Sequence, residues 1–286
     1  MDVSKASELY SLMSGSIEIQ PAAGKHAIEI MALAVEWDRP LVPEALAKME
    51  DTYRQSEDLR RLLPGIERIQ GMSLRFGDDG TTVTNPESGG LQLTQIGDSG
   101  KVVLTVSVRP DLIACNCLDY DRWNTVKPKA IEVLTPLVEC GLIAGHLIRA
   151  VGLQYQDSFR VQTSEPLVAA RQMFREGSPW LSPHAWTTDG AWHVHQGWFS
   201  LATSGRRVHN LLNVDFIAEI DCCVVRINGQ HRIQAVDKNG SEPRPLDLDD
   251  ISEALDGLHL DNKIALRKLL SDRVCSQIGL TLPEEA

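Results

Sequence analysis

Stretches in which every second residue is apolar dominate the chain, a pattern typical of strands with one buried face. In residues 102–108, for example, Val102, Leu104, Val106 and Val108 share one face. Residues 26–37 are predicted as a strand that is apolar on both faces, and further strands are predicted over residues 72–76, 91–96, 112–118, 143–161, 191–203, 206–220, 222–227 and 230–236. The short, turn-rich links between them predict antiparallel hairpins, and the strongest turn signal is Asn228-Gly229.

Helical spacing separates these runs. Pro43 is placed to begin a helix, and Leu46, Met49 and Tyr53 are spaced to share one of its faces. A second helix is predicted from Asp119 or Asp121 to Gly141, kinked or divided by Pro128 and Pro136. A short helix follows a cap at Ser164, and a last one spans residues 250–270, with His259 at the edge of its apolar side.

The order of these elements is the same in residues 21–141 and 142–286: a strand, a helix, several antiparallel strands and a helix. This order predicts an α+β fold of curved antiparallel sheets covered by helices. It is compatible with a tandem pseudo-repeat whose halves superpose, although no residue-level repeat accompanies it. Residues 1–20 are small and polar, and we expect a loosely attached tail there.

Composition narrows the functional classes. The 286 residues carry a formal net charge of -11, which disfavours nucleic acid as a partner because phosphates must be neutralised. No secretory signal and no run of roughly 20 apolar residues stands out, so we expect a cytoplasmic protein that does not enter a membrane. Six cysteines without a CxxC pair indicate reduced thiols, and Cys115 and Cys117 are expected in the core.

The stretch WHVHQGW, residues 192–198, places His193 and His195 on one face of a strand. Such a pair can bind a metal, with a third ligand from His209, Asp215 or Asp221. The opposing interpretation is a structural strand whose Trp192, Val194 and Trp198 face inward while the histidines face solvent. We adopt that second interpretation and expect neither a metal nor another cofactor.

Four residues are candidates for binding a ligand. Arg149, Tyr155 and Asp157 share one face of the long strand predicted over residues 143–161, where they are polar groups among apolar neighbours. His259 is the fourth candidate, at the edge of the last helix. A buried tyrosine with a bonded hydroxyl and a packed histidine are the structural alternatives.

Three segments carry a resemblance to a known family: RAVGLQYQD at residues 149–157, LHLDNKIALRKLLSD at residues 258–272, and Trp123 after Tyr120. They resemble a sporadically distributed, functionally uncharacterised family of bacterial proteins of similar length. Gln154, Asp157 and Leu266 depart from its pattern, which has a basic residue, an amide and an aromatic residue there. The resemblance implies no settled activity, and patchy occurrence is typical of accessory genes in defence or conflict systems.

No nucleophile elbow, Walker loop, HExxH motif or dinucleotide fingerprint occurs. We therefore expect a non-enzymatic protein that binds a protein partner or a small ligand. The four tryptophans within residues 180–198 fit this expectation, because tryptophan is enriched in binding hot spots. The alternative is an enzyme, either a metal-dependent hydrolase using His193 and His195 or one with acid–base work by Asp157 and His259.

Overall fold

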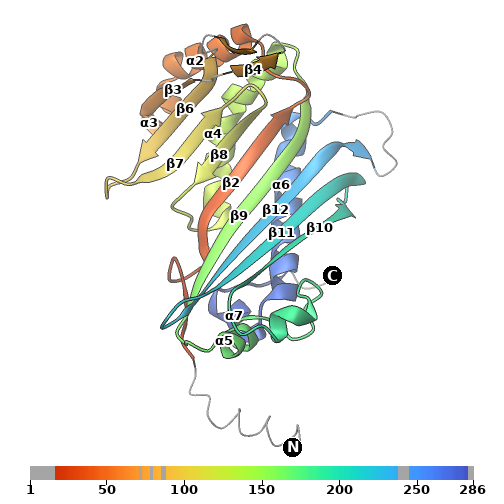
Figure 1. Ribbon diagram of the computed structural model, residues 1–286. Helices are drawn as coiled ribbons and strands as arrows, with labels where there is room; N and C mark the ends of the chain where they lie inside the picture. Colours follow the sequence, from red (N-terminus) through yellow and green to blue (C-terminus); the bar gives the residue numbers. More distant parts are fainter. Residues whose placement is uncertain (1–16, 71–72, 78–79, 85–87, 238–244, 283–286) are drawn as a thin grey trace, which may run out of the picture.

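The computed structural model describes residues 17–70, 73–77, 80–84, 88–237 and 245–282 (Figure 1). A 10-stranded, open, antiparallel sheet forms its frame, which confirms the predicted α+β class. The strands of this sheet are β1 (Ile19–Pro21), β2 (Ile28–Trp37), β3 (Gly65–Gln70), β6 (Ser88–Ile96), β7 (Val102–Val108), β8 (Leu112–Cys117), β9 (Ile148–Val161), β10 (Trp192–Leu201), β11 (Arg206–Ala218) and β12 (Cys223–Asp237). A separate hairpin comprises β4 (Ser73–Gly77) and β5 (Gly80–Thr84).

The strand order of the sheet is β10-β11-β12-β9-β2-β8-β7-β6-β3. From the centre outward, one half has the order β2, β8, β7, β6, β3, and the other half has the order β9, β12, β11, β10. In each half, the strand that comes first in the chain is central, the last strand lies beside it, and the earlier strands follow in reverse order. β2 and β9 hold equivalent places and pair antiparallel at the centre. This is the topology that a two-fold axis between β2 and β9 would generate, and superposition of the two halves remains a prediction.

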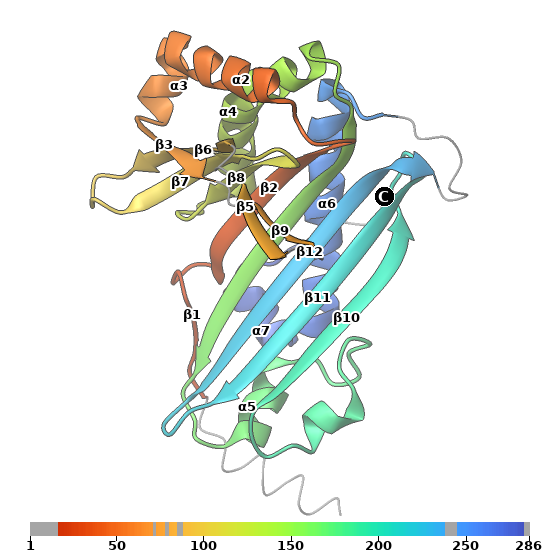
Figure 2. The same ribbon diagram turned by 45° about the horizontal axis from the view of Figure 1, so that its top comes forward.

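The helices cover one face of the sheet, and Figures 1 and 2 show α4 and α6 on that same side. They are α2 (Pro43–Gln55), α3 (Glu57–Leu62), α4 (Trp123–Ile143), α5 (Pro166–Met173), α6 (Leu248–Leu269) and α7 (Asp272–Gln277), with a 3₁₀ turn at Pro183–Trp186. Beneath them lie two apolar clusters, one centred on β2, β8 and α4, the other on β11, β12 and α5. α6 spans both clusters.

The sequence of α6 explains this bridging position. Asp247 and Asp250 form a reciprocal capping box at its N-terminus, which stabilises the first turn. Leu255 and Leu258 belong to the first cluster, whereas Leu266 and Leu269 belong to the second. The polar residues His259 and Asn262 lie between them on α6, so a polar site interrupts the core where the two clusters meet.

The predicted turn at Asn228-Gly229 is wrong, because both residues lie inside the continuous strand β12. Gly229 has a packing role instead. A Cβ atom on Gly229 would lie 2.4 Å from Oδ1 of Asn262, so glycine lets this part of α6 approach the sheet. A local turn signal was therefore overridden by a tertiary contact.

Gly229→Ala is expected to lower the free energy of unfolding by about 1–3 kcal/mol, because Asn262 must leave its position. Gly257→Ala in the same region is the matched control. Nothing lies within 4 Å of the Cβ site of Gly257, and alanine favours a helix interior, so a gain of up to about 1 kcal/mol is expected. Urea unfolding measures both values, and equal effects at the two glycines would contradict the packing role.

Helix α4 is a single helix, although Pro128 and Pro136 were expected to kink or divide it. Its buried face of eight residues outweighs the local cost of the prolines, which is about 3 kcal/mol each. Gly141 was expected to end this helix, but the helix runs to Ile143. A Cβ on Gly141 would lie 2.5 Å from the ring of Trp37, so this glycine also serves close packing.

Two further expectations need correction. Ile19 and Gln20, which composition assigned to the loose tail, belong to β1 on β9, because Ile19 is buried in the second apolar cluster. Residues 1–16 of that predicted tail lie outside the described residues. The N-cap of α5 is Glu165, without a side-chain bond, and not Ser164. There Pro166, with its fixed φ, begins the helix.

The stretch WHVHQGW forms β10 at one edge of the sheet, as a structural strand. Trp192, Val194 and Trp198 are half-buried and pack on the second cluster, while His193 and His195 are exposed. This confirms the predicted alternation. Trp198 stacks on Trp180 with ring centroids 4.2 Å apart. None of the helices in the described ranges is both long and apolar enough to cross a membrane.

Candidate functional site

A cavity of about 460 Å³ opens where the two apolar clusters meet. Its lining comes from five parts of the chain: residues 26–28, 120–124, β9, α6 and residues 278–281. Tyr155, Asp157 and His259 all face it. Three of the four candidate ligand-binding residues are therefore brought together in space.

Tyr155 and His259 form a hydrogen-bonded pair, with 2.8 Å between the phenolic oxygen and Nδ1. Burial raises the pKa of Tyr155 well above 10. Burial, and then the charge of Lys263, lowers the pKa of His259 to about 4. Both groups are therefore neutral at pH 7, and either ring tautomer of His259 can complete the bond.

The ring of His259 is fixed from its other side by Trp123 at the start of α4. The two rings stack with centroids 4.4 Å apart and an interplanar angle of 11°. The indole N–H of Trp123 donates to Asp256 of α6 at 2.8 Å, and Lys127 bonds the same carboxylate at 2.6 Å. These contacts tie α4 to α6 across the mouth of the cavity and hold His259 in one orientation.

Asp157 is the unusual group of the site. Asp157 is 3% exposed and lies on β9 between its strand neighbours, the half-buried Ile28 and the buried Ile227. Within the described ranges, no hydrogen bond or ion pair reaches its carboxyl group. Burial, and then the negative charge of Glu29, raises the pKa of Asp157 to about 7.

Two aromatic residues complete the inner wall. Tyr120 makes edge-to-face contacts with Tyr155 at 6.1 Å and with His26 at 5.3 Å. Burial, and then the charge of Asp157, raises the pKa of Tyr120 to about 12. Nε2 of His26 bonds the carbonyl of Tyr120 at 2.8 Å, so the loop before α4 is held against the loop before β2.

A buried polar chain runs from the cavity toward the edge of the sheet. Asn262, which lines the cavity, lies 3.2 Å from Nε2 of His231. Nδ1 of His231 lies 2.7 Å from Asn210, which in turn bonds Ser200 at 2.9 Å. Burial lowers the pKa of His231 to about 4, so the ring is neutral. A neutral ring has one N–H, so one of the two amides must present its NH₂ group to the ring.

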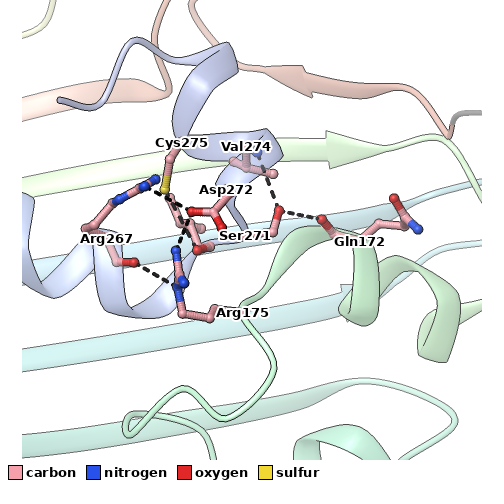
Figure 3. Close-up of polar contacts among 8 residues, drawn as sticks. Gln172, Arg175, Arg267, Ser271, Asp272, Val274 and Cys275 are labelled. Atoms are coloured by element: carbon pink, nitrogen blue, oxygen red, sulfur yellow. Dashed lines mark hydrogen bonds and ion pairs between the residues drawn. The ribbon is translucent and has the colours of Figure 1, made fainter.

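The outer wall depends on the corner between α6 and α7 (Figure 3). Asp272 accepts from Arg175 at 2.6 Å and from Arg267 at 3.0 Å, and the hydroxyl of Ser271 donates to the carbonyl of Gln172 at 2.8 Å. Ser271 also caps α7. This cluster holds α7 against α5, and α7 leads directly into residues 278–281 of the cavity wall.

Arg149, the fourth candidate, lies elsewhere. A register shift between Glu36 and Trp37 makes Arg149 the extra residue of a bulge, which turns its side chain away from Tyr155. Arg149 bonds Glu36 at 2.9 Å and is exposed. The expectation that it shares a face with Tyr155 and Asp157 is wrong, because strand alternation fails at a bulge.

Sequence reasoning missed His231 and Asn262. Asn262 lies one helical turn after His259, and this spacing was the available signal. The three segments that carry the family resemblance also meet at the cavity, through Tyr120 and Trp123, Tyr155 and Asp157, and His259 and Leu266. Their separation in sequence gives no hint of this contact.

His193 and His195 do not join this site. They project from the exposed side of β10, where His193 lies opposite Asp215 in the neighbouring strand. Across the described portion of the chain, no three histidine, cysteine, aspartate or glutamate side chains are grouped to hold a metal ion. A second cavity, of about 340 Å³, lies near Arg206 and Asp250, whose side chains pair with each other at 3.2 Å.

No protein-family model and no curated protein matches the chain. Among solved structures, a match is the di-domain ARO/CYC BexL from the BE-7585A biosynthetic pathway. The sequence identity is 10%, the TM-score is 0.16, and the match covers 83% of this chain and 96% of that chain. At this TM-score the likeness carries no argument about function.

Proposed function

We propose that the protein binds a small ligand in the cavity formed by β9, α6 and the start of α4, without converting it. The observation that carries this proposal is Asp157, a buried carboxyl group that projects into the cavity without a partner among the described residues. A buried polar group is costly unless it is hydrogen-bonded. A ligand that bonds Asp157 offsets this cost.

The rest of the cavity supports the same function. Its volume of about 460 Å³ falls in the range of small-molecule sites, and its lining combines aromatic and aliphatic side chains with polar and charged ones. The Trp123–His259 stack and the Tyr155–His259 bond fix the polar groups before a ligand arrives. Such preorganisation favours binding because fewer side chains lose freedom on association.

Mass spectrometry of small molecules released from the denatured, untagged protein tests this proposal. A Thr281→Trp variant narrows the mouth of the cavity, and Thr203→Trp is the matched control at the second cavity. Both threonines are exposed, so folding should persist. We expect a compound that is depleted at least tenfold by Thr281→Trp and retained by Thr203→Trp. Equal recovery from both variants, with no small metabolite raising Tm in a thermal-shift screen, would contradict the proposal.

A second candidate function is acid–base catalysis at the same cavity. The pKa of Asp157, about 7, is suited to proton transfer at neutral pH, and the Tyr155–His259 pair lies in the same site. Turnover of a bound compound that is lost in both Asp157→Asn and Tyr155→Phe, with folding intact, would favour this candidate. Unchanged compound after prolonged incubation with wild-type protein favours binding alone.

A further inference from the structure

We propose that the ligand is a small amphoteric amine of the amino-acid class. Its ammonium group meets Asp157 at the inner end of the cavity, and its acidic group meets Lys263 and Arg122 at the mouth. This inference rests on the proposed function and names the class of ligand. It follows from the distribution of charge and of hydrogen-bond acceptors along the cavity.

The inner end offers mainly acceptors. Asp157 contributes two carboxylate oxygens without partners in the described part of the chain. Tyr155 and Tyr120 add phenolic oxygens and the faces of their rings. An ammonium group has three donors and no acceptor, so it matches this set, and aromatic faces attract a cation further. A ligand carboxylate at this position would face Asp157 and the nearby charge of Glu29.

Two cations stand toward the mouth, together with the exposed carboxylate of Asp121. Arg122 is exposed and Lys263 half-buried, and both line the cavity. Neither cation has an ion-pair partner within the described ranges. Lys263 lies close enough to His259 to lower its pKa, which places this charge beside the Tyr155–His259 pair. The two cations can therefore receive an acidic group while the ammonium group lies deeper.

Another part of the lining is apolar. Ile28, Leu266 and Ile278 line the cavity together with Trp123. These side chains can bury the body of an aliphatic or aromatic amino acid, which contributes about 25 cal/mol for each Å² of apolar surface removed from water. One cavity thus combines a buried acid, apolar side chains and two outer cations, with the Asp121 carboxylate also in its lining.

Binding of an ammonium group beside Asp157 should release a proton, and this release can be measured. The titratable or charged groups around Asp157 and in the same cavity are Glu29, His26, Tyr120, Asp121, Arg122, Tyr155, His259 and Lys263. At pH 6, Asp157 is mostly protonated, because its pKa is about 7. An ammonium group favours the ionised carboxyl, so binding should release close to one proton per ligand. A carboxylate at the same place would keep Asp157 protonated and release none.

Three probes with the same phenyl body test the inference by titration calorimetry at pH 6. L-phenylalanine carries both charges, phenethylamine carries only the ammonium group, and 3-phenylpropionate carries only the carboxylate. We expect phenylalanine to bind tightest, phenethylamine three- to tenfold more weakly, and phenylpropionate at least 30-fold more weakly. Two buffers of different ionisation enthalpy should reveal the proton released by the two amines.

Substitutions test which residue contacts the ammonium group of the ligand and which contacts its acidic group. Asp157→Asn should weaken both amines at least tenfold, whereas Lys263→Gln should weaken phenylalanine about threefold and leave phenethylamine unchanged. Asp215→Asn, on the opposite face of the sheet, is the control and should alter neither. Phenylpropionate binding as tightly as phenethylamine, or no amine binding at 10 mM probe, overturns the inference. If another compound is then retained by wild type and lost in Thr281→Trp, the proposed function stands without it.

Discussion

Asp157→Asn is expected to stabilise the ligand-free protein by about 4 kcal/mol at pH 8. Burial raises the pKa of Asp157 from 3.8 to about 7, and each unit corresponds to about 1.4 kcal/mol. The folded state holds this proton more tightly than the unfolded state. The contribution of this proton to the free energy of unfolding is therefore fully present below pH 3.8 and is lost as pH rises from 3.8 through 7. Asparagine keeps the shape of the side chain without an ionisation to lose.

Urea unfolding between pH 4 and pH 8 measures this effect. The gain from Asp157→Asn should be small near pH 4 and should grow toward pH 8. Asp215→Asn is the control, because Asp215 is exposed and its replacement should change stability by less than about 0.5 kcal/mol. An Asp157→Asn variant that is less stable than wild type at pH 8 would show that the carboxylate has a stabilising partner.

This expected gain bears on function. A residue that destabilises the empty protein persists for a reason other than folding, and lost function is the recurrent cost of removing such residues. The same substitution is expected to weaken amine binding at least tenfold. Stabilisation by Asp157→Asn combined with loss of amine binding would therefore place Asp157 in a binding role.

Periodicity in the sequence predicted the elements well, because burial repeats every two residues in a strand and about every 3.6 in a helix. It also aligned Tyr155 with Asp157, since β9 is regular at those positions. It failed where a single contact outweighs local preference. Gly229 reads as a turn residue, yet it lies within a strand because Asn262 needs its space.

The cavity could be predicted only in part. Strand alternation and helix spacing identified Tyr155, Asp157 and His259 as candidates, but placed Arg149 with them because a bulge has no signature in alternation. The meeting of β9 with α6 depends on the register β2-β9-β12, which is set by long-range pairing. The contact of His231 with Asn210 and Asn262 follows from that register and is invisible in the sequence.

His231 leads to the second large expectation, a loss of stability in acid. Burial lowers the pKa of His231 from 6.5 to about 4, although its bond with Asn262 opposes the shift. The unfolded state therefore takes up a proton first as pH falls below 6.5. The neutral ring contributes about 3 kcal/mol to the free energy of unfolding above pH 6.5, and this contribution is lost between pH 6.5 and pH 4.

In the wild-type protein, Asp157 offsets much of this loss of stability in acid, because its own contribution to the free energy of unfolding grows as pH falls from 7 to 4. Asp157→Asn should therefore unmask it, with stability falling by about 3 kcal/mol or more from pH 6.5 to pH 4. His259, whose pKa is also lowered, acts in the same direction. Adding His231→Gln, which keeps an amide near Asn262, should remove about half of the slope, because the pKa of His259 is lowered to about the same value.

If His231→Gln does not fold, the ring can be followed directly. The ¹⁵N resonances of His231 in the folded Asp157→Asn protein should report a neutral ring with one protonated nitrogen down to about pH 4. An imidazolium at pH 6 would mean that both amides present their oxygens to a charged ring. The buried chain from Asn262 to Ser200 would then carry a positive charge behind the cavity, which would oppose an ammonium group at Asp157. One measurement on His231 thus tests both the acid loss and the electrostatic basis of amine binding.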